Sequence, residues 1–136
     1  MTIETIPDKV AERLAAEAVI WLTTVRKAGA PAPTPVWFLW SGGEFLILTQ
    51  PDSAKMAHLA RNSHVSLNFN GSAEGGEVSV FTGLAVVDPA GPTSEEWESY
   101  LAKYGTDMTG IDYTPERFLA DYSVLLRIRP ESLRGW

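Results

Sequence analysis

The stretch Thr34–Asn62, TPVWFLWSGGEFLILTQPDSAKMAHLARN, predicts a hairpin followed by a helix. Thr34–Trp40 is nearly all apolar and predicts a strand, Ser41–Glu44 predicts a glycine-containing turn, and Phe45–Gln50 predicts the returning strand. A proline-containing turn comes next, and Ala54–Asn62 predicts a helix with a modest apolar face. The chain on either side of this unit is therefore expected to complete a sheet.

Upstream of this unit, the chain predicts one helix and one strand. Asp8–Ala18 predicts the helix because its apolar residues recur at i, i+4 and i+8, and Val19–Arg26 predicts the strand because β-branched and aromatic residues dominate it. Prolines then occupy every second position. Because proline has no N–H to donate to a sheet, this segment is expected to be an edge strand, a bulge or an extended approach rather than a central strand. These prolines are Pro31, Pro33 and Pro35.

The rest of the chain predicts three strands and two helices. The predicted strands are His64–Asn70, Glu77–Asp88 and Tyr122–Arg129. Gly83 lies in the middle of the second of these strands and predicts a bulge or barrel corner, and Pro130 is expected to end the third. The predicted helices are Thr93–Tyr104, which begins with a capping-box sequence, and Thr114–Ala120, which begins with a Thr-Pro pair.

These elements predict a mainly β fold with flanking helices. Six strands joined largely by short hairpin-like links are expected to pair antiparallel. The glycine-marked bend favours a small, closed or partly open six-stranded barrel over a flat sheet, and the helices are too few for a doubly wound fold. Residues 1–136 are predicted to form a single domain, with a helix at about 8–18, the barrel at about 19–131 and a C-terminal tail to 136.

The chain has 136 residues, no cysteine and two histidines. The lack of cysteine excludes disulfides, thiolate nucleophiles, zinc ribbons and iron–sulfur clusters, and two histidines cannot form a three-histidine site within one chain, so we expect no metal. The sequence contains no G-x-S-x-G turn, no G-x-G-x-x-G motif and no P-loop. No apolar run approaches the roughly 18 residues of a membrane helix, and the N-terminus does not resemble a secretory signal. We therefore expect a cytoplasmic protein without a membrane partner.

The net charge of −6 argues against nucleic-acid binding, which depends on Lys and Arg. The charge is unevenly distributed along the chain. Val19–Asn70 holds four basic and two acidic residues, a balance of +2, whereas Gly71–Asp121 holds two basic and ten acidic residues, a balance of −8. An anionic ligand is therefore expected to bind to the first part of the chain.

The start of the predicted 54–62 helix is the candidate anion site. Free backbone N–H groups and the helix dipole favour an anion there. Ser53 adds a hydroxyl and Lys55 adds a positive charge, and the pair suits a phosphate group. Asn62 is expected to return to the Lys55 face of the helix, with Arg61 beside it. The alternative interpretation is that Lys55 and Arg61 are ordinary solvated residues.

Other residues have plainer explanations. His58 is either an acid–base group or a surface residue. Three aromatic residues are expected to pack in the helix core, namely Trp97, Tyr100 and Tyr104, and three glutamates are expected to form a solvated face, namely Glu95, Glu96 and Glu98.

Several segments resemble, in their order and spacing, the split-β-barrel flavin and deazaflavin proteins related to pyridoxamine 5′-phosphate oxidase. The segments are WLTTVRxxGxPxxxPVWF from Trp21, a strand that ends in Thr49-Gln50, SxKxxxLxxN from Ser53, VSLNF from Val65, and LRGW from Leu133. The LRGW ending is similar to that of the actinobacterial branch that uses the deazaflavin coenzyme F420. The resemblance extends over roughly Glu17–Trp136.

The resemblance also implies which residues contact the cofactor. It places Thr34, Pro35 and Val36 beside the tricyclic ring, Thr49 and Gln50 near the ring and ribityl chain, and Ser53, Lys55 and Arg61 at the phosphate. Trp136 is either a C-terminal core anchor or a lid over the partner subunit's cofactor. The chain has Ala54 where the oxidase has an arginine, and the region of Trp37 lacks the oxidase's basic residue. These departures argue against vitamin B6 oxidation.

The resemblance implies an F420-dependent oxidoreductase that transfers a hydride between the deazaflavin and a small organic acceptor such as a quinone, an enone or a tetrapyrrole. It also implies a homodimer with the cofactor at the subunit interface, and five tryptophans in 136 residues independently favour an interface. No catalytic side chain is identified, because the cofactor would supply the chemistry. The alternatives are an FMN-binding relative of the oxidase, a non-catalytic flavin- or haem-binding module, and a protein-interaction domain without a cofactor.

Overall fold

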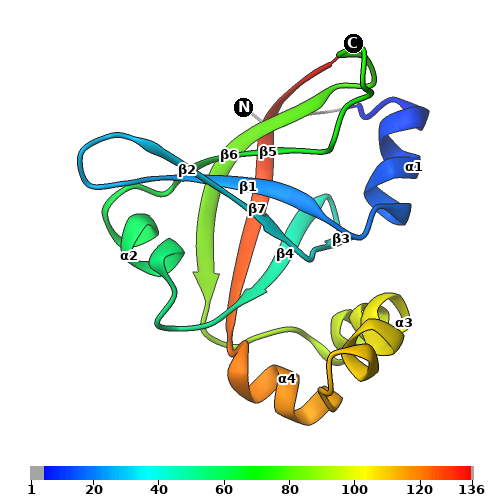
Figure 1. Ribbon diagram of the computed structural model, residues 1–136. Helices are drawn as coiled ribbons and strands as arrows, with labels where there is room; N and C mark the ends of the chain where they lie inside the picture. Colours follow the sequence, from blue (N-terminus) through cyan, green and yellow to red (C-terminus); the bar gives the residue numbers. More distant parts are fainter. Residues whose placement is uncertain (1–4, 136) are drawn as a thin grey trace.

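A computed structural model describes residues 5–135 and shows one curled antiparallel sheet flanked by helices (Figure 1). The strands are β1 (Ile20–Val25), β2 (Pro31–Val36), β3 (Leu39–Ser41), β4 (Glu44–Thr49), β5 (His64–Asn68), β6 (Ser79–Asp88) and β7 (Val124–Gly135). The helices are α1 (Asp8–Ala16), α2 (Ala54–Arg61), α3 (Ser94–Gly110) and α4 (Pro115–Asp121). The mainly β fold with flanking helices is therefore confirmed.

The strand order of the sheet is β2-β1-β5-β6-β7-β4-β3. Strands β2 and β3 form its two edges, and within residues 5–135 no ladder joins them. The sheet is therefore a curled half-barrel that stays open between β2 and β3, as a split barrel does.

The prediction of six strands is wrong, because the predicted strand Thr34–Trp40 is interrupted. Strand β2 ends at Val36, and β3 begins only at Leu39. At the break, the Phe38 N–H donates to the hydroxyl of Tyr104 at 2.9 Å, and the Phe38 carbonyl accepts from the Lys103 ammonium at 2.8 Å. Side chains of α3 thus take the backbone groups of Phe38 that a continuous strand would use in a ladder.

The alternating prolines lie in the edge strand β2, one of the places predicted for them. They pair with outward-facing residues of β1, and within residues 5–135 no strand pairs with the other edge of β2. The pairs are Pro31 with Val25, Pro33 with Thr23, and Pro35 with Trp21. An edge position tolerates the missing N–H groups.

Gly83 marks a bulge, as predicted, but Pro130 does not end the last strand. Gly83 pairs with Pro130 while Thr82 pairs with Ser132, so Glu131 is the extra residue, and β7 continues to Gly135. A Cβ atom on Gly83 would lie 2.8 Å from the Arg129 carbonyl oxygen. The bulge lets proline sit inside a long strand without breaking the sheet.

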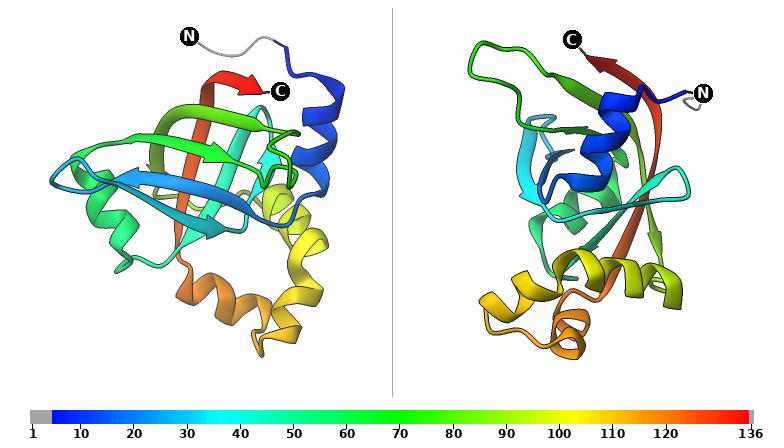
Figure 2. Two further views of the ribbon diagram at one scale, coloured as in Figure 1. Left: turned by 45° about the horizontal axis from the view of Figure 1, so that its top comes forward. Right: turned by 90° about the vertical axis from the view of Figure 1, so that its right-hand side faces the viewer.

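The apolar residues form two clusters, one on each side of the sheet. The inner cluster fills the concave side, and residues of α1 and α2 contribute to it. These two helices lie at opposite ends of the curled sheet (Figures 1 and 2). The outer cluster lies between α3, α4 and the outer face of β3, β4 and β7, and it is rich in tyrosine. The expected packing of Tyr100 and Tyr104 in this core is therefore confirmed.

Helix α3 starts where predicted but extends to Gly110 rather than Tyr104, since its apolar face continues to Met108, which is fully buried. The Thr93–Glu96 capping box is present with both of its hydrogen bonds. The expectation that Glu96 is solvated is wrong. Its carboxylate binds the Arg127 guanidinium through two contacts of 2.7 and 2.8 Å, and its side chain is 15% exposed.

The helices within residues 5–135 are too short or too polar to cross a membrane.

Candidate functional site

A cavity of about 440 Å³ opens where the ends of β2 and β4 meet α2, α3 and α4. Its residues come from five separate segments, so only the folded chain assembles it. They are Val19, Pro35, Val36, Trp37, Leu48, Thr49, Gln50, Ser53, Lys55, Tyr100, Ile111, Phe118 and Tyr122. The polar residues of this set come mainly from the β4–α2 connection, and the aromatic ones come from the β2–β3 break and the two later helices. The cavity therefore has a polar end and an aromatic end.

Ser53 occupies the polar end of the cavity as the N-cap residue of α2. Its backbone N–H donates to the Gln50 carbonyl at 3.2 Å, which closes the turn that joins β4 to α2. Its hydroxyl lies 3.2 Å from the buried Thr49 hydroxyl and makes no capping bond to the helix. The Ser53 hydroxyl can therefore bind a ligand at a helix N-terminus, where partial positive charge favours an anion.

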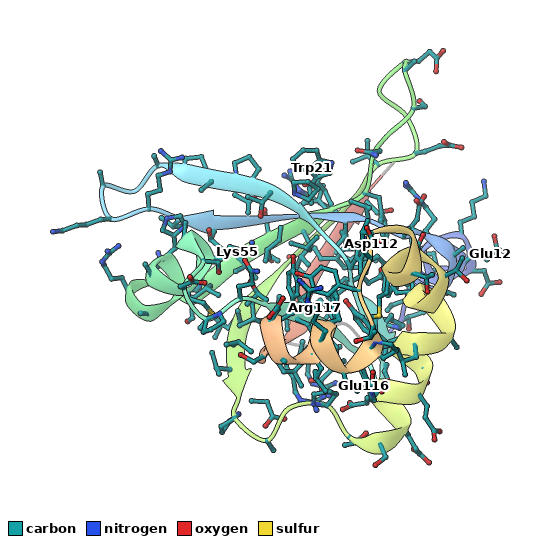
Figure 3. All side chains as sticks on the ribbon, turned by 60° about the horizontal axis from the view of Figure 1, so that its bottom comes forward. Glu12, Trp21, Lys55, Asp112, Glu116 and Arg117 are labelled. Atoms are coloured by element: carbon teal, nitrogen blue, oxygen red, sulfur yellow. The ribbon has the colours of Figure 1, made fainter. Side chains whose placement is uncertain are left out.

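Lys55 supplies the positive charge of the cavity. It is half-buried in the first turn of α2, on the side of the helix that faces the other elements (Figure 3). Burial lowers the pKa of the Lys55 amine below its usual value. No carboxylate within residues 5–135 forms an ion pair with it. A half-buried ammonium without a counter-charge is stabilised by an anionic ligand, so this end of the cavity suits a phosphate.

Stacked rings line the other end of the cavity. The Trp37 ring lies parallel to the Tyr104 ring, with 4.5 Å between centroids and an interplanar angle of 4°. Trp37 also stacks on Phe118 at 5.6 Å, and Phe118 stacks on Tyr122 at 4.5 Å. These contacts fix the orientation of the rings and give an apolar wall. The apolar, conjugated part of a ligand can pack against this wall.

Tyr100 adds a buried hydroxyl to the aromatic end. The residue is 3% exposed, and within residues 5–135 its hydroxyl has no hydrogen-bond partner. Burial, together with the nearby Tyr104 and Tyr122 hydroxyls, raises the pKa of Tyr100 above its usual value. The hydroxyl therefore stays protonated at neutral pH.

The structure brings together six of the nine residues predicted to contact a cofactor. The six lie around the cavity, namely Pro35, Val36, Thr49, Gln50, Ser53 and Lys55. Thr34 is outside the lining: it pairs with the core residue Leu22, and its hydroxyl is buried without a partner in the described part of the chain. Arg61 is exposed in the last turn of α2 and does not line the cavity. Trp136 lies outside the described residues.

Two other residues of the α2 region have structural roles. The His58 ring nitrogen Nδ1 lies 2.8 Å from the hydroxyl of Thr24, which is fully buried, so His58 ties α2 to β1. Asn62 does not return to the Lys55 face as a ligand. Its side-chain oxygen accepts from the His64 N–H at 3.0 Å and shapes the turn into β5.

Sequence reasoning did not assign most of the aromatic end to the site. It treated Tyr100 as core packing, which is correct, but that residue also lines the cavity. The Trp37 region was noted for lacking the oxidase's basic residue, whereas Phe118, Tyr122 and Ile111 were not connected with the site. Their helices pack over β4 only in the tertiary structure, and no local pattern indicates that contact.

The chain was compared with known proteins. The family model for pyridoxamine 5′-phosphate oxidase matches residues 6–136. The search of curated proteins finds no match. Solved structures do match. An F420 reductase is 20% identical with a TM-score of 0.71, and the match covers 95% of this chain and 98% of that one.

Two other solved structures have different described roles. The heme storage protein HutZ from Vibrio cholerae is 17% identical with a TM-score of 0.71, and the match covers 99% of this chain and 95% of that one. General stress protein 26 from Bacillus anthracis is 18% identical with a TM-score of 0.69, and the match covers 93% of this chain and 89% of that one. These likenesses establish the shared fold. Because the family model extends over nearly the whole sequence, the chain belongs to the pyridoxamine 5′-phosphate oxidase family.

Proposed function

We propose that this protein is a cytoplasmic, homodimeric oxidoreductase that binds F420 in the cavity and transfers a hydride between it and a small organic acceptor, such as a quinone, an enone or a tetrapyrrole. One observation carries the proposal: a single cavity joins the half-buried ammonium of Lys55, which forms no ion pair within residues 5–135, to an aromatic wall. F420 likewise joins a phosphate-bearing chain to a planar tricyclic ring.

The polar end of the cavity fits the phosphate. The Lys55 ammonium and the Ser53 hydroxyl are both donors, and both belong to the start of α2. Hydrogen bonds that involve ionised groups are roughly twice as strong as neutral ones. We therefore assign phosphate binding to Ser53 and Lys55. Arg61 is a weaker candidate, because it is exposed on the last turn of α2.

The apolar residues of the cavity fit the ring system. Bound deazaflavin supplies the hydride chemistry. The chain's own residues hold the ring and exclude water, and Trp37 and Phe118 serve this role because their stacking fixes both rings. Thr49 and Gln50 also line the polar end of the cavity, where a polyol chain can accept or donate hydrogen bonds.

The first alternative is FMN, which also has a phosphate and a tricyclic ring. The similar fold of an F420 reductase and the presence of Ala54, where the oxidase has arginine, favour F420. A haem-binding role draws support from the similar fold of HutZ. Histidine is a usual ligand of haem iron, but neither His58 nor His64 lines the cavity, which argues against the haem-binding role.

The outer face of β1, β2 and β6 is the candidate interface of the proposed homodimer. Val86 is 61% exposed there, and Leu84 is also exposed, although both are apolar. The outer cluster with α3 and α4 lies over β3, β4 and β7 instead. Pro35 pairs with Trp21 at the edge of the uncovered face and also lines the cavity, so a second copy seated there would adjoin the cavity. Light scattering on the purified protein tests the dimer.

The proposed function is tested by titrating the purified protein with F420 and FMN in parallel. Binding of F420, together with oxidation of reduced F420 by an organic acceptor, supports the proposal. Tighter binding of FMN favours the first alternative. Binding of F420 without turnover by any acceptor favours a non-catalytic module.

A further inference from the structure

Ile111 is an exposed apolar residue at the mouth of the cavity. Its side chain is 54% exposed, although it lines the cavity together with buried residues such as Phe118. The other exposed residues of the lining are Pro35 and Gln50, so these three residues mark the opening. An apolar side chain in this position leaves water when a molecule binds over it, and that transfer favours binding.

The turn that follows α3 fixes the position of Ile111. The N–H groups of Ile111 and Tyr113 donate to the Met108 carbonyl at 3.2 and 2.8 Å, and Met108 itself is fully buried. The Asp112 N–H donates to the Thr109 carbonyl at 3.1 Å, and Asp112 has a left-handed backbone conformation with a φ of 61°. The backbone of Ile111 is therefore held at the rim, as is required of a residue that selects a ligand.

The chain around Ile111 is acidic. Residues 107–121 hold four acidic residues and one basic residue, a balance of −3, whereas Lys55 gives the polar end of the cavity a positive charge. Asp112 is exposed, and Figure 3 shows it on the connection between α3 and α4, away from Lys55 on α2. The basic residue of this segment, Arg117, lies over a tyrosine ring. This part of the rim therefore repels an anion but not a neutral molecule.

The size of the cavity decides which part of the site is left for the acceptor molecule. Small-molecule sites have volumes of roughly 300–1,000 Å³, so a cavity of about 440 Å³ accommodates one such molecule. Under the proposed function this molecule is the cofactor, with its phosphate at Lys55 and its ring against Trp37 and Phe118. The acceptor must then approach through the opening, where Ile111 and Pro35 are the exposed apolar residues.

We propose that Ile111 is a specificity-determining residue that contacts the acceptor molecule at the mouth of the cavity, and that the adjacent Asp112 selects neutral acceptors over anionic ones. The inference rests on the proposed function, because that function assigns the interior of the cavity to the cofactor. Ile111 supplies the apolar contact, and Asp112 supplies the repulsion. Specific sites commonly combine an attractive and a repulsive element in this way.

Two quinones test this directly, 1,4-naphthoquinone and 1,4-naphthoquinone-2-sulfonate. They share a flat fused skeleton, and only the second is anionic. Binding of each to protein saturated with oxidised F420, which has no hydride to donate, is measured by NMR titration. Backbone amide resonances give the affinities. The labelled methyl resonance of Ile111, identified by its loss in Ile111→Ala, reports the contact.

We expect 1,4-naphthoquinone to shift the Ile111 methyl resonance and to bind more tightly than the sulfonate. Ile111→Ala should weaken binding of 1,4-naphthoquinone about four- to tenfold, the effect of one to two lost methylene contacts. Val87→Ala is the matched control, because Val87 is also an exposed apolar residue but lies outside the cavity lining. It should leave the binding of both quinones unchanged.

Asp112→Asn tests the charge separately. Asparagine tolerates the left-handed conformation as aspartate does, so the turn is retained. The sulfonate should bind about two- to fivefold more tightly to this variant in dilute buffer, the effect of removing one nearby like charge in water, and the gain should shrink at high salt. Binding of 1,4-naphthoquinone should not change.

The inference is overturned if 1,4-naphthoquinone does not bind, if the wild type binds the two quinones equally, or if Ile111→Ala and Val87→Ala have the same effect. It is also overturned as regards Asp112 if Asp112→Asn does not improve sulfonate binding.

Binding of F420 is measured first, by fluorescence, so the two proposals can fail separately. If F420 does not bind, the proposed function is overturned, and the quinones are titrated into the ligand-free protein. The same preference for the neutral quinone and the same dependence on Ile111 are expected there, because Ile111 still lines the opening. Normal F420 binding without this preference would overturn the present inference alone.

Discussion

The hydroxyl of Tyr104 lies 2.9 Å from both the backbone nitrogen and the carbonyl oxygen of Phe38, residues that are 66 positions apart in the chain. It also lies 2.7 Å from the carbonyl oxygen of Ala18. This one buried side chain therefore fixes the break between β2 and β3, holds the start of β1 nearby, and supports the stacked ring of Trp37 in the cavity wall.

Replacement of Tyr104 by Phe removes these contacts and leaves buried backbone groups unpaired. We expect the free energy of unfolding to fall by about 1–3 kcal/mol, the cost of an unsatisfied buried group. Urea denaturation measures the loss. Tyr113→Phe, which removes a partly buried phenol contact to Asp121 and leaves no backbone group unpaired, should cost less. Equal losses in the two variants would contradict the role given to Tyr104.

Glu96 makes the stability depend on pH in the acid range. Its hydrogen bonds to Arg127 lower the pKa of its carboxyl from 4.5 to about 2. As the pH falls, the unfolded chain binds this proton before the folded one does, so the stabilisation is present above pH 4.5 and is lost progressively as the pH falls toward 2. We expect Glu96→Gln to flatten this dependence. Denaturation series from pH 7 to 2.5 measure it, and Glu98→Gln, which should leave the dependence intact, is the control.

Lys103 should titrate well below the usual pKa of a lysine. Burial lowers the pKa of Lys103 to about 8, while its ammonium binds the Phe38 carbonyl and lies 3.7 Å above the Phe38 ring. The folded state therefore loses this proton before the unfolded state, and the contribution of Lys103 to stability rises with pH between about 8 and 10.5. NMR titration of isotopically methylated lysines should show a resonance near this pKa that is missing in Lys103→Met. A Lys103 resonance that titrates near 10.5 would show that the amine is not buried.

Two glycines should respond to alanine in opposite directions. A Cβ on Gly83 would meet the Arg129 carbonyl oxygen at 2.8 Å, so Gly83→Ala should destabilise the fold by about 1–3 kcal/mol. A Cβ on Gly105, inside α3, meets nothing within 4 Å, so Gly105→Ala should stabilise it by about 0.5–1 kcal/mol. Thermal unfolding of both variants measures the difference. A stabilising Gly83→Ala would contradict the close approach at the bulge.

The parts of the fold that sequence predicted are those that depend on local chemistry. The Ser41–Glu44 turn, the proline edge strand, the Gly83 bulge and the Thr93 capping box each follow from the conformational needs of a few neighbouring residues. The polar end of the cavity belongs to this class, because one short segment of chain, Thr49–Lys55, provides it.

The parts that sequence missed depend on contacts between distant segments. The VWFLW segment has the composition of one strand, and only the α3 side chains that bind the Phe38 backbone show why it breaks. The continuation of β7 through Pro130 depends on the bulge opposite Gly83. Glu96 looked solvated because its partner, Arg127, is 31 residues away. The aromatic end of the cavity was missed for the same reason.

The central claim is that Lys55 binds the phosphate of a deazaflavin, and quenching of F420 fluorescence on titration tests it most directly. We predict that the wild-type protein binds F420 more tightly than FMN. Lys55→Ala should weaken F420 binding by about 10- to 150-fold, the effect of a lost charged hydrogen bond. Lys27→Ala, in the exposed turn between β1 and β2, should have no effect. An unchanged F420 affinity in Lys55→Ala, or no binding of F420 to the wild type, would contradict the account.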